Sequence, residues 1–102
     1  MDHAMSFSEL DILANWLLEQ FTQLGYSQTK PWRDGEFFIG GKQCEFEKDG
    51  CLYYFLFSLL ADDQVLFGLD NQTESKKVFR HTIQWSENWK YTIWTEILSK
   101  MA

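Results

Sequence analysis

The chain has 102 residues, of which 45% are apolar and 18% aromatic, so it is long enough for one packed domain and too apolar for a disordered segment. Fifteen acidic and nine basic side chains give a formal net charge of −6. This balance argues against direct nucleic-acid binding, because phosphate neutralisation needs clustered Lys and Arg. The longest uninterrupted apolar run, residues 51–57, is too short to cross a bilayer.

The N-terminal region is acidic. Asp2, Glu9 and Asp11 stand where a secretory signal would need cationic side chains, so we expect a protein of the cytoplasm. The chain has no repeats, low-complexity tracts or linker-like segments, and we therefore treat residues 1–102 as a single acidic domain.

Residues 6–25 have the pattern of an amphipathic helix. Ser6 and Glu9 have the spacing of a capping box, and Gly25 suits the left-handed residue that ends a helix. Apolar side chains recur every three or four residues on one face, namely Leu10, Leu13, Leu17, Phe21 and Leu24. Residues 26–35, which hold the only proline, Pro31, are predicted to form a loop.

The middle of the chain alternates as strands. A short strand is expected at 36–39 and a second one at 42–48. Asp49-Gly50 is a hairpin signal that leads into a long apolar strand over 51–60. After a predicted four-residue turn, 61–64, residues 65–69 return as a further strand.

The C-terminal third begins with a polar loop at 70–77. Residues 78–85 alternate as a strand, and a helix that starts near Thr73 is the competing interpretation. Residues 86–101 are predicted to form a helix with Ser86 as its N-cap, and Trp94 and Ile97 are expected at the centre of its buried stripe. The fold class is therefore α+β: an N-terminal helix, a mostly antiparallel sheet of four to five strands, and a C-terminal helix, with both helices on one face of the sheet.

The turn lengths predict which side chains share a sheet face. A two-residue turn at Asp49-Gly50 and a four-residue turn at 61–64 place one set under the helices, namely Cys44, Phe46, Tyr53, Phe55, Phe57, Leu59 and Leu66. The opposite set is Glu45, Glu47, Leu52, Tyr54, Leu56, Ser58, Phe67 and Leu69. This second face, apolar in the centre with carboxylates at its edge, is typical of a protein interface. The alternatives are that one helix crosses over to cover it or that a homodimer buries it.

The residues that carry chemistry are few. Cys44 and Cys51 are expected on the same face about four strand positions apart, roughly 13 Å, which is too far for a disulfide. His81 lies on an apolar strand face without a motif that would orient a catalytic partner. We expect no metal site, no cofactor and no enzymatic activity, because metal-ligand spacings, phosphate loops and nucleophile elbows are absent from the sequence. A small enzyme that pairs His81 with Cys44 or Cys51 is the remaining alternative.

Acidity, surplus aromatics and the lack of a catalytic set favour a protein that binds a basic protein partner. Bacterial immunity proteins and phage-encoded inhibitors are similar in character: one short acidic domain that neutralises a toxin or an enzyme with a basic active site. Two mechanisms follow, steric plugging by exposed rings and electrostatic mimicry of phosphates. The candidate partner-binding residues are Glu45, Glu47, Tyr54, Trp32, Asp62, Asp63 and Asp70.

A second hypothesis is a dedicated chaperone of a secreted protein. A Leu-rich opening helix that ends at Leu24-Gly25, followed by an acidic hairpin, resembles the chaperones of type III secretion. The resemblance implies an acidic helix–sheet–helix domain that dimerises, but the sequence lacks the middle helix of that family.

Overall fold

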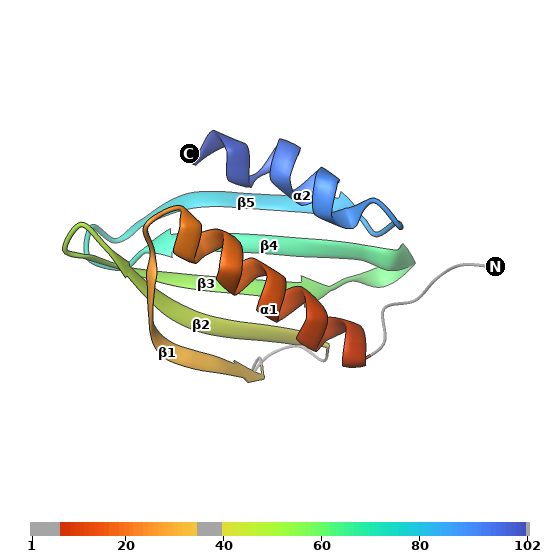
Figure 1. Ribbon diagram of the computed structural model, residues 1–102, viewed down its shortest axis with the longest axis horizontal. Helices are drawn as coiled ribbons and strands as arrows, with labels where there is room; N and C mark the ends of the chain where they lie inside the picture. Colours follow the sequence, from red (N-terminus) through yellow and green to blue (C-terminus); the bar gives the residue numbers. More distant parts are fainter. Residues whose placement is uncertain (1–6, 35–39, 102) are drawn as a thin grey trace.

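A computed structural model describes residues 7–34 and 40–101. Its elements follow in the order α1 (Phe7–Gln23), β1 (Ser27–Asp34), β2 (Gly41–Lys48), β3 (Cys51–Leu59), a 3₁₀ turn (Ala61–Asp63), β4 (Gln64–Asn71), β5 (Lys76–Gln84), α2 (Trp89–Glu96) and a second 3₁₀ turn (Leu98–Lys100). The five strands form one antiparallel meander in the order β1-β2-β3-β4-β5. Figure 1 shows both helices in front of the sheet, with α1 running across it and α2 beside β5. The α+β class and the placement of both helices on one face are confirmed.

The end of α1 follows from its sequence. Gly25 takes a φ of +94°, and the amides of Gly25 and Tyr26 donate to the carbonyls of Thr22 and Phe21 at 3.1 and 2.9 Å. This pair of bonds is the Schellman motif, which satisfies carbonyls that the helix leaves free. The rings of Phe21 and Tyr26 pack edge to face at 5.2 Å. The predicted cap Ser6 lies outside the described residues.

The core lies between α1 and the near face of the sheet. Phe21 projects from α1 and stacks on Phe46 of β2, with ring centroids 4.6 Å apart, and lies 4.8 Å from Phe55 of β3. All three rings are buried. Leu10, Leu13 and Leu17 are buried along the same helix face, as their spacing predicts.

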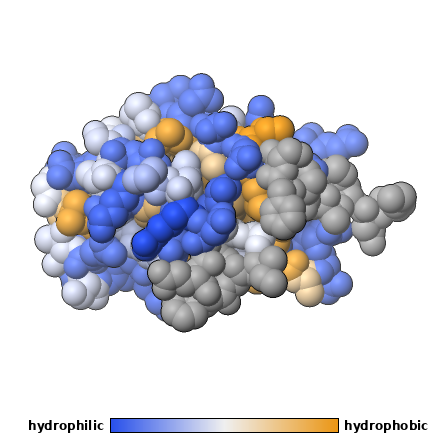
Figure 2. Space-filling model, turned by 90° about the horizontal axis from the view of Figure 1, so that it is seen from below, coloured by the Kyte–Doolittle hydropathy of each residue, from blue (hydrophilic) through white to orange (hydrophobic). Residues whose placement is uncertain are grey.

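Residues 27–34 form a strand, so the prediction of a loop there was wrong. β1 is an edge strand that pairs only with β2, and its register shifts on both sides of Lys30, close to Pro31. An edge strand tolerates proline because its outer amides need no partner. Figure 2 views the molecule from this edge, where hydrophilic residues cover most of the described surface in view. The strand predicted at 36–39 lies outside the described residues.

The β2–β3 hairpin has the predicted register. Asp49 and Gly50 both have positive φ, 52° and 80°, as a type I′ turn requires. Lys48 pairs with Cys51 and Cys44 pairs with Phe55.

The β3–β4 register was predicted one residue out. Leu59, not Leu60, pairs with Val65, because the Leu60 amide donates to the Gln64 carbonyl at 2.7 Å and closes a five-residue connection. A shift of one residue exchanges the two faces of a strand. Phe67 and Leu69 therefore lie in the core, while Leu66, Gly68 and Asp70 lie on the far face.

The C-terminal elements differ in detail from the expectation. Residues 76–84 form strand β5, which decides between strand and helix for this segment. The helix begins at Trp89, with Asn88 rather than Ser86 at the N-cap position. Ile93 and Ile97 are buried, but Trp94 is 38% exposed, so its placement in the core was wrong. Trp94 lies about 100° around the helix from Ile93 and faces away from the sheet.

Candidate protein interface

The sheet face opposite the helices is the candidate site, and we call it the open face. Strand pairing places on it Gln43, Glu45 and Glu47 of β2, Leu52, Tyr54, Leu56 and Ser58 of β3, Leu66, Gly68 and Asp70 of β4, and Arg80 and Thr82 of β5. Both helices lie on the other side of the sheet (Figure 1), and no helix or strand within residues 7–34 and 40–101 crosses this face.

Tyr54 stands in the middle of the open face. It pairs with Glu45 on one side and with Asp70 on the other, so the three side chains form a row across β2, β3 and β4. Its hydroxyl donates a hydrogen bond to Oε1 of Gln43, a residue that is only 4% exposed. The ring is half-buried and is held in place by this bond.

The carboxylates of the open face are not equivalent. Glu45 accepts a hydrogen bond from the Thr29 hydroxyl at 2.7 Å and lies 3.8 Å from Lys30 Nζ, and its side chain is only 14% exposed. Asp70 lies 2.8 Å from Arg80. Glu47 is exposed and makes no hydrogen bond or ion pair with the part of the chain that is described. Glu47 is therefore the carboxylate of this face whose charge is least compensated.

The structure brings together four of the seven predicted site residues: Glu45, Glu47, Tyr54 and Asp70. Trp32 lies on the helix side, where its ring packs 5.5 Å from Phe57 and 5.9 Å from Phe55. Trp32 thus covers the core and takes no part in the open face. Asp62 and Asp63 lie in the turn between β3 and β4, at the end of the sheet, with φ of 60° and 57°.

Arg80 is a charged member of the open face that was not predicted from the sequence. It is the residue of β5 that pairs with Gly68 of β4. A glycine within a strand is a signal of a close backbone approach, and that signal was present in the sequence.

The thiols and the imidazole lie apart. Cys44 is on β2, three strands from β5, which is roughly 14 Å at ~4.8 Å per strand. His81 on β5 instead places Nε2 2.8 Å from Glu96 Oε1 of α2. Cys51 lies on β3 six residues from Phe57, the position level with His81, which is roughly 20 Å at ~3.3 Å per residue. Neither cysteine therefore pairs with His81, and the described residues hold no cluster of three or more His, Cys, Asp or Glu that would bind a metal.

The two cysteines are free thiols, and their reactivity is expected to differ. Burial raises the pKa of Cys44 from 9.0 to about 12, so this thiol stays protonated where an ordinary one ionises. Iodoacetamide at pH 9 should label the half-exposed Cys51 in the native protein and label Cys44 only after denaturation. Peptide mass spectrometry reads both sites, and equal native labelling, or a Cys44–Cys51 disulfide, would contradict the assignment.

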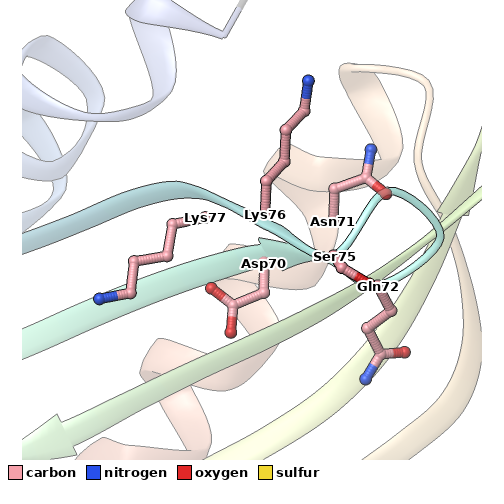
Figure 3. A pocket seen from close by; sticks show the side chains of 6 residues that line it. All are labelled: Asp70, Asn71, Gln72, Ser75, Lys76 and Lys77. Carbon is pink, nitrogen blue, oxygen red and sulfur yellow. The ribbon is translucent and has the colours of Figure 1, made fainter.

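A shallow pocket of about 340 Å³ lies at the β4–β5 turn (Figure 3). Figure 3 shows Asp70 and Lys77 on one side of the strand pair, while Asn71 and Lys76 point to the other. These four side chains diverge, as neighbours along a strand do, and do not converge on a common point. The pocket therefore lacks the arrangement of a catalytic site.

Comparison with protein families, with curated proteins and with solved structures finds no significant match to this chain. Among the residues described here, no helix is both long enough and apolar enough to span a membrane.

Proposed function

We propose that the protein is a binding domain whose open face docks onto a protein partner, and that it acts as an inhibitor or immunity-type protein against a toxin or enzyme with a basic active site. The observation that carries the proposal is the placement of both helices on one face. The opposite face keeps Tyr54, Leu56 and Leu66 half-exposed at its centre and charged side chains at its edges. Protein interfaces have this anatomy, with tyrosine and arginine as their strongest contributors.

Charge supports a basic partner. The open face itself is nearly balanced, because Lys30 and Arg80 accompany Glu45 and Asp70. The excess acid of the chain lies in exposed residues such as Glu47, Asp49 and Asp62. Exposed charge of one sign steers a partner of the opposite sign and raises its association rate.

The test is capture of a partner from the host, followed by an assay of what that partner does. The parent protein and Tyr54→Ala, each immobilised, are compared for the proteins that they retain. The proposal expects a basic protein on the parent column that is depleted on the variant column, and loss of that protein's activity when the parent protein is added. A partner retained equally by both columns, with its activity intact, would contradict the proposal.

Glu47→Lys tests electrostatic steering. We expect slower association with the captured partner and a flatter salt dependence, with dissociation little changed, because an exposed charge at an interface edge acts on encounter. Surface plasmon resonance at two salt concentrations measures both rates. Glu19→Lys, an equal charge change on an exposed position of α1, is the matched control. Equal effects of the two variants would assign the steering to net charge alone and would remove Glu47 from the interface.

A chaperone of a secreted protein is the second candidate, and one observation favours it. The helical layer exposes apolar side chains of its own, with Ile12 56%, Tyr91 72% and Trp94 38% exposed. A chaperone of the kind considered above would bury such residues in a homodimer. Sedimentation of the parent protein and of Trp94→Glu separates the two candidates, because only a dimer through the helices dissociates in the variant.

A further inference from the structure

The guanidinium of Arg80, on the edge strand β5, lies against Gly68 of the neighbouring strand β4 on the open face. A Cβ atom added to Gly68 would stand 2.7 Å from Nη1 and 2.9 Å from Cζ of Arg80. A side chain at this position would displace the guanidinium, so glycine leaves room for Arg80 to lie against the strand.

Two neighbours fix the guanidinium in this position. Arg80 Nη2 donates to Asp70 Oδ2 at 3.0 Å, and Nη1 lies 2.8 Å from Asp70 Oδ1. Nη1 also donates to the Phe79 carbonyl at 3.0 Å. An arginine that is already held in this way loses little conformational entropy when a partner binds it.

These bonds use the two terminal nitrogens, and Asp70 compensates the charge. The side chain of Arg80 is 32% exposed and that of Asp70 is 30% exposed. Leu56 pairs with Gly68 on the β3 side, and Tyr54 pairs with Asp70. The strand pairing therefore puts Leu56 and Tyr54 of β3 on the same face as Arg80, one strand beyond Gly68 and Asp70.

We infer that Arg80 is an anchor of the open face and that it takes an aromatic side chain of the partner protein, stacked on the guanidinium plane. The inference rests on the proposed function and names the group that the face recognises. A guanidinium attracts the negative face of an aromatic ring, and the contact gains strength once it is desolvated between apolar neighbours.

The charges of Arg80 and Asp70 disfavour a charged side chain of the partner at this position. A carboxylate would compete with Asp70 for the same terminal nitrogens of Arg80. An ammonium group would meet the positive charge of Arg80 itself, which remains local although Asp70 compensates it. An aromatic ring carries no net charge and meets neither penalty.

Arg80→Lys and Gly68→Ala test the inference in two ways. Arg80→Lys keeps the positive charge but removes the planar guanidinium. Gly68→Ala keeps Arg80 but adds a methyl group where the guanidinium lies. Each should weaken binding of the captured partner by about tenfold or more. Arg33→Lys is the matched control, because Arg33 is exposed and pairs with Gln43 from β1, at the opposite edge of the sheet from Arg80. Circular dichroism establishes that each variant is folded.

A second probe does not depend on the natural partner. A phage-displayed library of random peptides is selected on the parent protein, and the selected peptides are tested on Arg80→Lys. We expect peptides enriched in Trp, Tyr or Phe that bind Arg80→Lys at least about tenfold more weakly. Selected peptides without aromatic enrichment, or with equal binding to both proteins, would overturn the inference.

The outcomes separate the two proposals. If Tyr54→Ala loses the partner while Arg80→Lys and Gly68→Ala keep it, the open face remains the interface and the role of Arg80 is wrong. If all three variants keep the partner, the proposed function fails as well. If Arg33→Lys weakens binding as much as Arg80→Lys does, any arginine of this face contributes equally to binding. The inference that Arg80 is an anchor is then overturned.

Discussion

Phe21→Ala is expected to lower the free energy of unfolding by about 3–5 kcal/mol, which is most of the stability of a marginal domain. The Phe21 ring is fully buried and contacts three others, on Tyr26, Phe46 and Phe55, at centroid distances of 5.2, 4.6 and 4.8 Å. The variant loses the transfer free energy of the ring and leaves a cavity where α1 meets the sheet. Urea unfolding followed by tryptophan fluorescence measures the change.

Tyr91→Ala is the matched control for this prediction. It also removes an aromatic ring from a helix, but Tyr91 is 72% exposed, so the change should stay within about 0.5 kcal/mol. Trp94→Ala should fall between the two, because Trp94 is 38% exposed. A loss for Tyr91→Ala as large as that for Phe21→Ala would mean that α2 is covered in solution, as in a dimer through the helices.

The local signals of this sequence that rest on backbone geometry predicted structure well. Gly25 ends α1 and Asp49-Gly50 makes the hairpin, because both positions need a positive φ that few residues adopt without cost. The spacing of apolar residues in α1 likewise places Leu13 and Phe21 in the core. In each case the determinant lies within a few residues of the position that it decides.

The β3–β4 turn shows where local signals stop. Asp62 and Asp63 both adopt positive φ, which is uncommon for residues with a side chain, and the connection has five residues rather than four. Nothing in Ala61-Asp62-Asp63-Gln64 distinguishes the two lengths beforehand. Because a strand has a period of two, this single residue decides whether Phe67 or Leu66 lies in the core.

β1 escaped prediction for a different reason. Its sequence, Ser-Gln-Thr-Lys-Pro-Trp-Arg-Asp, lacks apolar alternation, and only Trp32 brings a large apolar side chain to the core. The strand exists because β2 offers it a partner, which is a tertiary effect. Trp32 was expected to be an exposed ring for the same reason: on a loop it would face solvent, but on a strand it faces Phe57.

Some residues of the candidate site are placed by local sequence signals, and others are placed by the pairing of distant strands. Glu45, Glu47 and Tyr54 lie on the hairpin whose register the sequence determines, so their common face was predictable. Arg80 reaches the site through the pairing of β4 with β5. The face on which this pair lies depends on the β3–β4 turn, whose length was predicted wrongly. Asp70 was predicted as a partner-binding residue because of its negative charge, but in the structure that charge is compensated by an ion pair with Arg80.

Tyr54→Ala is expected to weaken the complex with the captured partner by about 2 kcal/mol or more, on the order of thirtyfold, and to act through faster dissociation. Tyr54 is the aromatic residue at the centre of the open face, where an anchor becomes fully desolvated on binding, and such anchors determine how long a complex lasts. Glu47→Lys, by contrast, should change association. Surface plasmon resonance at two salt concentrations separates the two rate constants.

Tyr54→Phe isolates the contribution of the hydroxyl. This variant loses the hydrogen bond to Gln43 and keeps the ring, so it should retain most of the affinity. Circular dichroism must show that Tyr54→Ala is folded, since the change leaves Gln43 without the hydrogen bond from the Tyr54 hydroxyl. If the variant unfolds, Tyr54 is part of the core and the case for an open binding face fails. A folded Tyr54→Ala that dissociates at the parent rate would move the interface away from this face, and the Asp62-Asp63 turn would be the next surface to test.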